Sequence, residues 1–298
     1  MFEDIPMGFL EKTMGLVGVG IVFAMVFGGY MLAGGHLHVV WQPYEIMIIF
    51  GAAAGAMVIA NPMPVVQEAI KRSIKALTGS GPGKKDYLDL LQMLFRLYQI
   101  YRRDGPQAIE KHIEKPEESE IFKAYPSFLH NHHAVEYFCD TLKIVLSADL
   151  SQYDIDDLLD QDLKTMHEEE HHAAHAIGNV ADALPGLGIV AAVLGIVHTM
   201  GKLDQGTEVI GHSVGAALIG TFLGVFMCYG VIGPIAQKMG KDIEAQGQYL
   251  KVVKSSLVAL QRGSPPLVCV EFARRTIFPH ERPSFDEMDA ATKEKKAA

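Results

Sequence analysis

Four long apolar stretches divide the chain. They are Met14–Gly35, Ile46–Pro64, Leu184–Met200 and Val209–Ile235. Each is close to the ~20 residues that a helix needs to cross the hydrocarbon layer of a bilayer, although the third is shorter. The pattern predicts four transmembrane helices, grouped as two hairpins on either side of a polar region of about 120 residues.

The polar regions carry helical patterns of their own. From Asp86, the expected N-cap, to Gly105, apolar side chains recur every three or four residues, as on one face of a helix. Residues 152–182 hold an apolar stripe, which predicts one long helix that runs directly into the third span, and residues 237–260 extend the fourth. Since no segment alternates as a strand does, we expect an all-α polytopic membrane protein with a helical cytoplasmic domain.

These patterns divide the chain into six regions. They are an N-terminal interfacial segment (1–13), spans one and two (14–64), a cytoplasmic helical domain (65–183), spans three and four (184–235), a cytoplasmic helical extension (236–285) and a disordered tail (286–298). The first region is interpreted as a short helix at the membrane surface, with an unstructured leader as the alternative.

The distribution of Lys and Arg predicts the orientation. Residues 65–183 hold 13 of the 26 basic residues and 236–298 hold 11, whereas the loop 36–45 has none. Because basic residues stay on the cytoplasmic side of membrane spans, both polar regions and both termini are expected in the cytoplasm. The formal net charge of −9 gives no reason to expect nucleic-acid binding. In this reducing compartment Cys139, Cys228 and Cys269 should be free thiols.

The interiors of the four stretches lack Asp, Glu, Lys and Arg. A protein that moves ions unaided usually keeps an ionisable group at mid-membrane, because only such a group can hold the ion away from water. This chain offers hydroxyl groups and a His there instead. If it takes part in ion flow, the carboxylate must come from another polypeptide.

Three residues in the spans have two interpretations each. Pro185 opens the third span and Pro234 lies near the inner end of the fourth. A proline there marks a helix end or a packing kink, or else the pair acts as hinges between the membrane and the cytoplasm. The Thr221 hydroxyl either bonds back to its own helix, which is commoner, or lines a polar path.

One motif raises the possibility of an enzyme. His167-Glu-Glu-Glu-His171 matches the H-E-x-x-H pattern of zinc proteases, with Glu168 as the base. The match lies in a Glu-rich run on a helix without an obvious substrate cleft, so a solvated helix face is the favoured interpretation. We expect no enzyme activity, no catalytic residues, no metal site and no cofactor.

Several motifs taken in order resemble the MotA/TolQ/ExbB family, and within it the flagellar stator subunits. The motifs are Val26–Tyr30, Gln42–Glu45, Arg96-Leu97, Glu118–Phe122, Tyr125-Pro126, Leu184–His198, Gly220–Gly224, Pro234 and Glu281–Phe285. The resemblance covers nearly the whole chain. An ExbB- or TolQ-like energiser of outer-membrane processes is the alternative, but those relatives typically have three spans and a smaller cytoplasmic domain.

The resemblance implies partners and a place in the cell. It implies a ring of five subunits in the bacterial inner membrane, around a dimer of a single-span, peptidoglycan-binding MotB-type partner that supplies the essential aspartate. The cytoplasmic domain would push the rotor protein FliG. The charged residues that would meet the rotor are Arg102 and Glu110, with Arg103 as a competitor for the basic role.

The resemblance also implies which ion moves. Pro185, Ala192, Thr221 and Pro234 occupy the positions of the ion pathway and its coupling. Sodium-type relatives have Thr where this chain has Ala192, alongside a Thr that matches Thr221. Because a proton needs no shell of oxygen ligands, the missing hydroxyl favours H⁺ as the transported ion.

Overall fold

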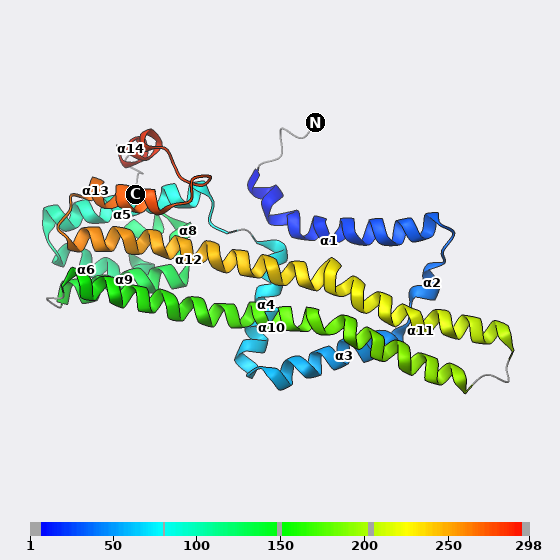
Figure 1. Ribbon diagram of the computed structural model, residues 1–298. Coiled ribbons are helices and arrows are strands. Elements are labelled where there is room, and N and C mark those ends of the chain that lie inside the picture. The colour runs from blue at the N-terminus through cyan, green and yellow to red at the C-terminus, as the bar shows by residue number, and fades with distance from the viewer. Residues whose placement is uncertain (1–6, 80, 148–150, 202–205, 294–298) are drawn as a thin grey trace. The chain divides into compact units, whose positions relative to one another are not determined.

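A computed structural model describes residues 7–79, 81–147, 151–201 and 206–293, and within these ranges the chain forms helices and no strand. It divides into two compact units (Figure 1). Unit 1 comprises Met1–Ser80 and Glu169–Asp242, and unit 2 comprises Gly81–Glu168 and Ile243–Ala298. The all-α fold class is therefore confirmed.

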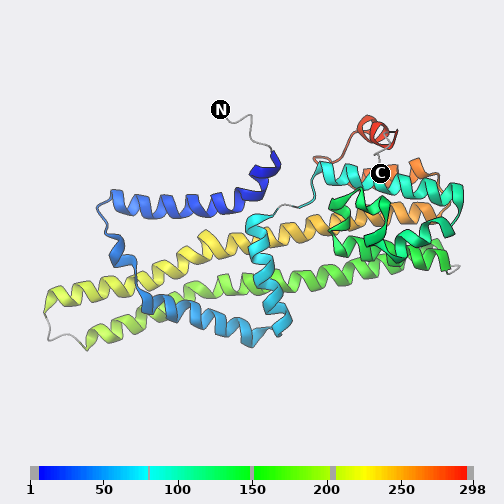
Figure 2. The same cartoon turned by 180° about the vertical axis from the view of Figure 1, so that it is seen from behind.

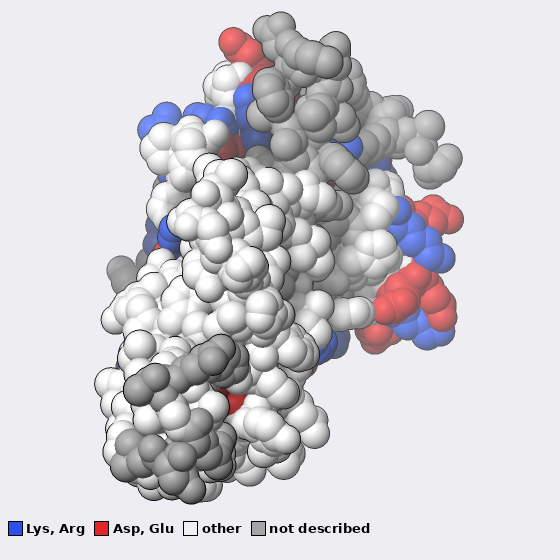
Figure 3. Space-filling view, turned by 90° about the vertical axis from the view of Figure 1, so that its right-hand side faces the viewer, with Lys and Arg blue, Asp and Glu red and all other residues white. Residues whose placement is uncertain are grey.

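Unit 1 holds the apolar helices. They are α1 (Met7–Leu32), α2 (Leu37–Val40), α3 (Pro43–Ala60), α4 (Met63–Thr78), the later part of α10 (Gln152–Met200), α11 (Thr207–Met227), the π-helix η3 (Cys228–Ile232) and the start of α12 (Gly233–Gln261). Four segments are long and apolar enough to cross a membrane, namely Thr13–Leu32, Leu37–Ala60, Tyr153–Met200 and Val209–Gln261. Seen from the end where α10 stops and α11 begins, the front surface is almost wholly uncharged (Figure 3). The four predicted spans are thus confirmed.

Helix α10 is continuous over 49 residues and contains Pro185 in its interior. The prediction of one long helix that leads into the third span is confirmed, and Pro185 does not end a helix. The pyrrolidine ring removes one backbone donor, and the freed carbonyl can be satisfied locally inside a membrane bundle.

The fourth span changes its winding just before Pro234. The Gly233 N–H donates to the carbonyl of Cys228, five residues back, which is the hydrogen bond of a π-helix. Pro234 has no N–H to continue the α-helical ladder, so a wide turn forms immediately upstream of it. The helix resumes as α12 and runs to Gln261.

Unit 2 packs the remaining helices around an aromatic and aliphatic core. They are α5 (Lys84–Asp104), α6 (Gln107–Glu114), the 3₁₀ turn η1 (Pro116–Glu118), α7 (Glu120–Lys123), α8 (Pro126–Leu129), α9 (His132–Ser147), the start of α10, most of α12, α13 (Pro266–Thr276) and α14 (Phe285–Lys293). Figure 2 shows α5 and α9 beside the long helices. Phe122, Phe128 and Phe138 are fully buried and in mutual ring contact. Lys254 joins α12 to α10 through Asp156 and Asp160, each at 2.7 Å.

Two predictions at element boundaries are wrong. The disordered tail was expected from residue 286, but 286–293 belong to α14, whose Met288 is fully buried. Ser284 and Glu287 form a reciprocal cap, in which the Ser284 N–H donates to Glu287 Oε2 at 2.7 Å and the Glu287 N–H to Ser284 Oγ at 3.1 Å. The N-cap of α5 is Gly83, and Asp86 lies inside the helix, where it accepts from the Gly83 N–H at 2.9 Å.

The boundaries expected at the two ends of the chain can be compared with the structure only in part. Residues 1–6 of the expected interfacial segment and 294–298 of the expected tail lie outside the described residues. From Met7 the chain is already in the helix that carries the first span, so 7–13 do not form a separate element.

Candidate functional site

A seam of small residues joins α10 to α11 inside unit 1. A Cβ atom built on Gly188 would lie 2.6 Å from the Gly220 carbonyl oxygen and 3.3 Å from the Thr221 Cα atom. A Cβ on Gly220 would lie 3.2 Å from the backbone nitrogen of Ala192, and one on Gly195 would lie 2.8 Å from the Ala217 Cβ atom. These positions leave no room for side chains, so the two backbones are in direct contact.

The seam places Ala192 and Thr221 on facing stretches of the two helices, with Ala192 beside Gly220 and Thr221 beside Gly188. Ala192 is buried, with 6% of its surface exposed, and Thr221 is half-buried beside Gly220. Among the described residues the Thr221 hydroxyl makes no hydrogen bond, whereas the Thr199 hydroxyl donates to the Gly195 carbonyl of its own helix at 2.8 Å. The Thr221 hydroxyl can therefore form a hydrogen bond with a group outside this chain, whereas the Thr199 hydroxyl already donates within its own helix.

Glu45 is a feature that the sequence interpretation missed. Helix α3 begins at Pro43, three residues before the predicted span, and Glu45 in its first turn is only 9% exposed. Its Oε1 atom lies 3.4 Å from the Cβ position of Gly195, and it shares one buried face of α3 with Ile49 and Ala53. Gly195 follows Ala192 by three residues, so this carboxylate lies about 4.5 Å along α10 from the level of Ala192. The spacing of Glu45, Ile49 and Ala53 at every fourth residue was the signal for this face.

The two prolines occupy different surroundings in unit 1. Pro185 is half-buried, and the preceding carbonyl, that of Leu184, is in close contact with Gly224 of α11. Pro234 is exposed and lines a cavity next to η3. The structure therefore places Pro185 in the α10–α11 seam and Pro234 outside it.

In unit 2 the three candidate rotor residues lie around the corner between α5 and α6. Arg102 and Arg103 are in the last turn of α5, Gly105 turns the chain with φ 84°, and Glu110 is in the first turn of α6. All three side chains are exposed. Arg103 is bonded to Asp104 through both Nε (2.8 Å) and Nη2 (2.7 Å), and this pair raises the pKa of Arg103 and lowers that of Asp104. Within the described residues neither Arg102 nor Glu110 has an ion pair.

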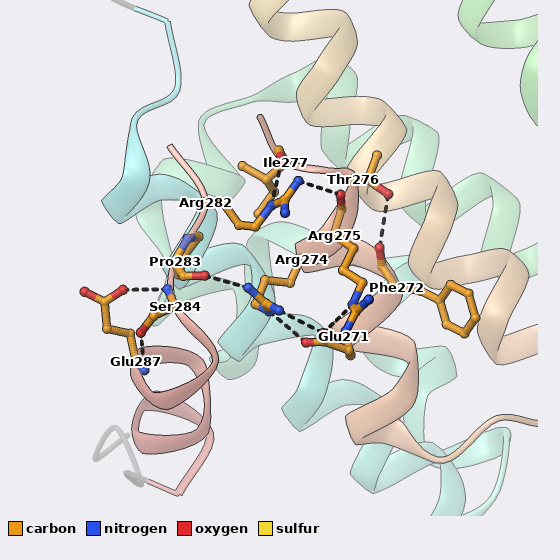
Figure 4. A network of polar contacts seen from close by, with 10 residues as sticks. All are labelled: Glu271, Phe272, Arg274, Arg275, Thr276, Ile277, Arg282, Pro283, Ser284 and Glu287. Atoms are coloured by element: carbon orange, nitrogen blue, oxygen red, sulfur yellow. Dashed lines mark hydrogen bonds and ion pairs between the residues drawn. The ribbon is translucent and has the colours of Figure 1, made fainter. Parts of the chain in front are cut away.

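A polar network fixes the helix that supports Arg102. Helix α13 packs on α5, and Arg102 is the residue of α5 whose charge acts on the Cys269 thiol of α13. At the other end of α13, Arg274 binds Glu271 through two bonds of 2.7 and 2.8 Å and also donates to the Pro283 carbonyl at 3.0 Å (Figure 4). Arg275 adds a bond of 2.7 Å to the same carboxylate. Hydrogen bonds from Arg274 lower the pKa of Glu271 to about 2, with a smaller contribution from Arg275.

The other sequence motifs give no comparable site. In the part of the chain that the structure describes, no group of three His, Cys, Asp or Glu side chains is placed to hold a metal ion. His167 and His171 lie one turn apart on α10, where His167 is exposed. The three cysteines are buried free thiols.

Comparison with known proteins agrees with this arrangement. The profile of the family "Motility protein A N-terminal" matches residues 16–105, and that of the "MotA/TolQ/ExbB proton channel family" matches residues 129–251. Motility protein A of Escherichia coli is 36% identical over 92% of this chain and 93% of its own length, and that of Salmonella typhimurium is 35% identical over the same shares. Chemotaxis protein LafT of Vibrio parahaemolyticus is 34% identical over 92% of this chain and 96% of its own length.

Two solved structures share the fold. MotAB of C. jejuni matches with a TM-score of 0.76 at 18% identity, over 92% of this chain and 99% of that one. The flagellar MotAB stator complex of Bacillus subtilis matches with a TM-score of 0.73 at 21% identity, over 90% and 98%.

Four apolar helices, a close-packed α10–α11 seam and a charged helical domain define a membrane protein of the proton channel class. Within that class, the relatives separate the motility proteins from the energisers of outer-membrane processes. The chain belongs to the motility protein A family, the flagellar stator subunits.

Proposed function

We propose that this stator subunit couples proton flow to torque on FliG, as part of five copies around a dimer of a MotB-type partner. The complex lies in the bacterial inner membrane with both termini of the chain in the cytoplasm. The chain itself is not an enzyme. The similarity to MotAB complexes and the basic residues next to the spans support this proposal.

The α10–α11 seam is the observation that carries the proposal. Ala192 and Thr221 lie on facing stretches of two membrane-spanning helices, and neither can bind a proton. The only buried acid of the described spans, Glu45, lies nearer the hairpin end of α10. A proton that passes Thr221 therefore needs a carboxylate from the partner, which the MotB-type aspartate supplies.

The energy available is sufficient for such a coupling. Moving one charge through the membrane potential releases about 2.3 kcal/mol per 100 mV. A conformational equilibrium separated by a few kcal/mol can be biased by this amount. Pro185 in the seam and Pro234 below the π-helix are the places where α10 and α12 can respond.

The side chain at position 192 supports H⁺ over Na⁺. A sodium ion needs several oxygen ligands, and Ala192 offers none next to the Thr221 hydroxyl. Swimming speed should therefore follow the proton-motive force and be unchanged when sodium is replaced by potassium. Sodium-dependent swimming would overturn the choice of ion.

The contacts of the α5–α6 corner support Arg102 over Arg103 as the basic residue that meets the rotor. Arg103 is already bound to Asp104, while Arg102 and Glu110 are exposed charges without an ion pair among the described residues. Such exposed pairs contribute little binding energy and mainly steer and align the partner.

Deletion of the coding region tests the proposed function. Cells without a duplicate stator should keep their filaments and stop swimming. The purified chain, reconstituted alone in liposomes, should conduct no protons, whereas the complex with its partner should do so once activated. Normal swimming, loss of filaments, or proton conductance of the isolated chain would contradict the proposal.

A further inference from the structure

A cavity of about 580 Å³ opens between α1, α4 and the η3–α12 segment of unit 1. Figures 1 and 2 show α1 next to the fourth span, and α4 crosses near the N-terminal end of α1. Gly18 leaves part of this space open, because a Cβ atom on it would meet no atom within 4 Å. On one side the cavity is bounded by the contact of α1 with α4, where the Cβ position of Gly15 lies 2.9 Å from the Leu77 carbonyl oxygen.

Aromatic rings hold α1 against α11 beyond the cavity. Phe226 contacts Phe23 and Phe27 of α1, with ring centroids 5.2 and 5.5 Å apart. The helices are therefore fixed together at the rings and at α4, and stand apart between them. The cavity therefore lies between two points at which α1 is packed against its neighbours.

The lining is apolar except at one end. Met14, Val19, Val22, Leu77 and Ile235 face the space, together with Tyr229 and Lys238. Lys238 pairs with Asp242, but an ammonium group has three donors and its side chain is 38% exposed. The apolar slot thus ends beside the Lys238 ammonium group.

The size of the cavity selects a thin occupant. A helix with its side chains is about 10 Å across, so 580 Å³ would hold only about five residues of one. An acyl chain is narrower, and the surrounding bilayer supplies such chains at high concentration. A positive charge where the slot meets the membrane surface attracts an anionic headgroup.

We propose that this cavity binds one acyl chain of an anionic phospholipid, with the headgroup phosphate bound by Lys238. The acyl chain of the lipid would lie against Gly230, Val231 and Pro234. It would therefore pack on the wide turn of the fourth span. The proposal requires only that the spans lie in a bilayer. The orientation proposed above assigns the lipid to the cytoplasmic leaflet.

Photo-crosslinking tests the occupant. The full stator complex is reconstituted in vesicles of phosphatidylglycerol or phosphatidylcholine that carry a diazirine on the acyl chain, and the labelled peptides are identified by mass spectrometry. We expect adducts concentrated on residues 14–22 and 229–235. Gly18→Leu should fill the slot and remove most of this labelling. Gly20→Leu is the matched control, because Gly20 is also open to a Cβ atom on α1 but does not line the cavity.

A second pair of variants tests the headgroup. Lys238→Gln should lower the preference for phosphatidylglycerol over phosphatidylcholine by about fivefold, because both headgroups carry a phosphate but only phosphatidylglycerol is net negative and gains from the lysine charge. Lys241→Gln, an exposed lysine on the same helix outside the cavity, should leave the preference unchanged.

Three results would overturn the proposal. The first is equal labelling of Gly18→Leu and Gly20→Leu. The second is the absence of any adduct in the assembled complex, which would mean that protein covers the slot. The third is the same lipid preference in Lys238→Gln and in wild type. Swimming is not a readout in these assays, so a failed motor assignment would not affect them.

Discussion

At the scale of single residues, the corner between α5 and α6 holds one arginine that is ion-paired and two charged side chains that have no ion pair among the described residues. Arg103 binds Asp104 through two bonds, whereas Arg102 and Glu110 point into solvent without an ion pair among the described residues. Two adjacent arginines of the same charge thus have different capacities to meet a partner.

Charge reversal tests this difference. Arg102→Glu or Glu110→Lys should reduce motility severely, because each turns an attraction to the rotor into a repulsion. Arg103→Ala should reduce it much less. Swarm diameter in soft agar measures the effect, with immunoblots as the control for protein level. If Arg103→Ala lost as much motility as Arg102→Glu, the ion pair with Asp104 would not determine which arginine meets the rotor.

The Glu271 carboxylate makes the stability of unit 2 dependent on pH. Its pKa is about 2 in the folded state, below the ordinary 4.5, because Arg274 and Arg275 donate to the charged form. A group whose pKa is lowered by folding stabilises the protein above its unfolded pKa, and this stabilisation is lost as the pH falls toward the folded pKa.

Thermal unfolding of the purified complex should therefore separate wild type from Glu271→Gln in one pH range. Wild type should melt at a higher temperature above about pH 5, and the difference should shrink as the pH falls from 4.5 toward 2. Glu117→Gln, at an exposed position, is the control and should show a small difference throughout. A constant difference for Glu271→Gln would contradict the role of the carboxylate charge.

At the scale of elements, the contact between α10 and α11 depends on residues without side chains. Gly188, Gly220 and Gly224 allow carbonyl groups of one helix to touch the backbone of the other. Any added carbon atom must push the helices apart or distort them, and overpacking of this kind costs about 1–3 kcal/mol.

Gly188→Leu should consequently reduce both the amount of assembled stator and motility. Gly186→Leu is the matched control, because Gly186 is on the same helix next to Pro185 and a Cβ atom there meets nothing within 4 Å. Assembly is measured by size-exclusion chromatography of the complex in detergent. Comparable losses in the two variants would show that the seam is not close-packed in the assembly.

The C-terminal helix shows where sequence reasoning failed and why. Apolar periodicity located the four spans and the long helix α10, because burial of a continuous face leaves a strong signal over many residues. Helix α14 is nine residues long and mostly polar, so its periodicity is weak, and its Ser284–Glu287 cap was the signal that was overlooked. The burial of Glu45 was missed because the apolar stretch begins only at Ile46, whereas α3 begins at Pro43.

The α14 cap can be tested directly. Ser284→Ala should destabilise the attachment of α14 by about 1 kcal/mol, the usual effect of losing an N-cap. Amide hydrogen exchange of residues 285–293 should become faster. Ser147→Ala is the control, since its hydroxyl donates to a carbonyl of its own helix and caps no amide. Unchanged exchange in Ser284→Ala would contradict the importance of the cap.

At the scale of the whole molecule, cores of two kinds stabilise the chain. In unit 2, tyrosines, phenylalanines and leucines surround Cys139 and Cys269, and burial raises the pKa of these thiols to about 12 and about 11. In unit 1 the described apolar side chains are mostly exposed, because a bilayer replaces the missing core. The sequence predicted this division from composition, but side-chain contacts such as the α10–α11 seam require coordinates.

The buried thiols provide a probe of the folded state of unit 2. At pH 8 the native complex should leave Cys139 and Cys269 unmodified by iodoacetamide, because the thiolate is the reactive form and both groups are enclosed. Both should react when the protein is unfolded in guanidinium chloride. Ser147→Cys, at an exposed position, should react in the native state. Rapid native labelling of Cys139 would show that the core opens easily.

The wide turn at Cys228–Ile232 contains one residue more than an α-helix of the same length would use. Pro234 fixes this turn in place, because a residue without an N–H cannot continue the α-helical ladder. One extra residue rotates everything that follows by about 100° relative to an uninterrupted α-helix. The direction in which each side chain of α12 points is therefore set by the turn at Cys228–Ile232.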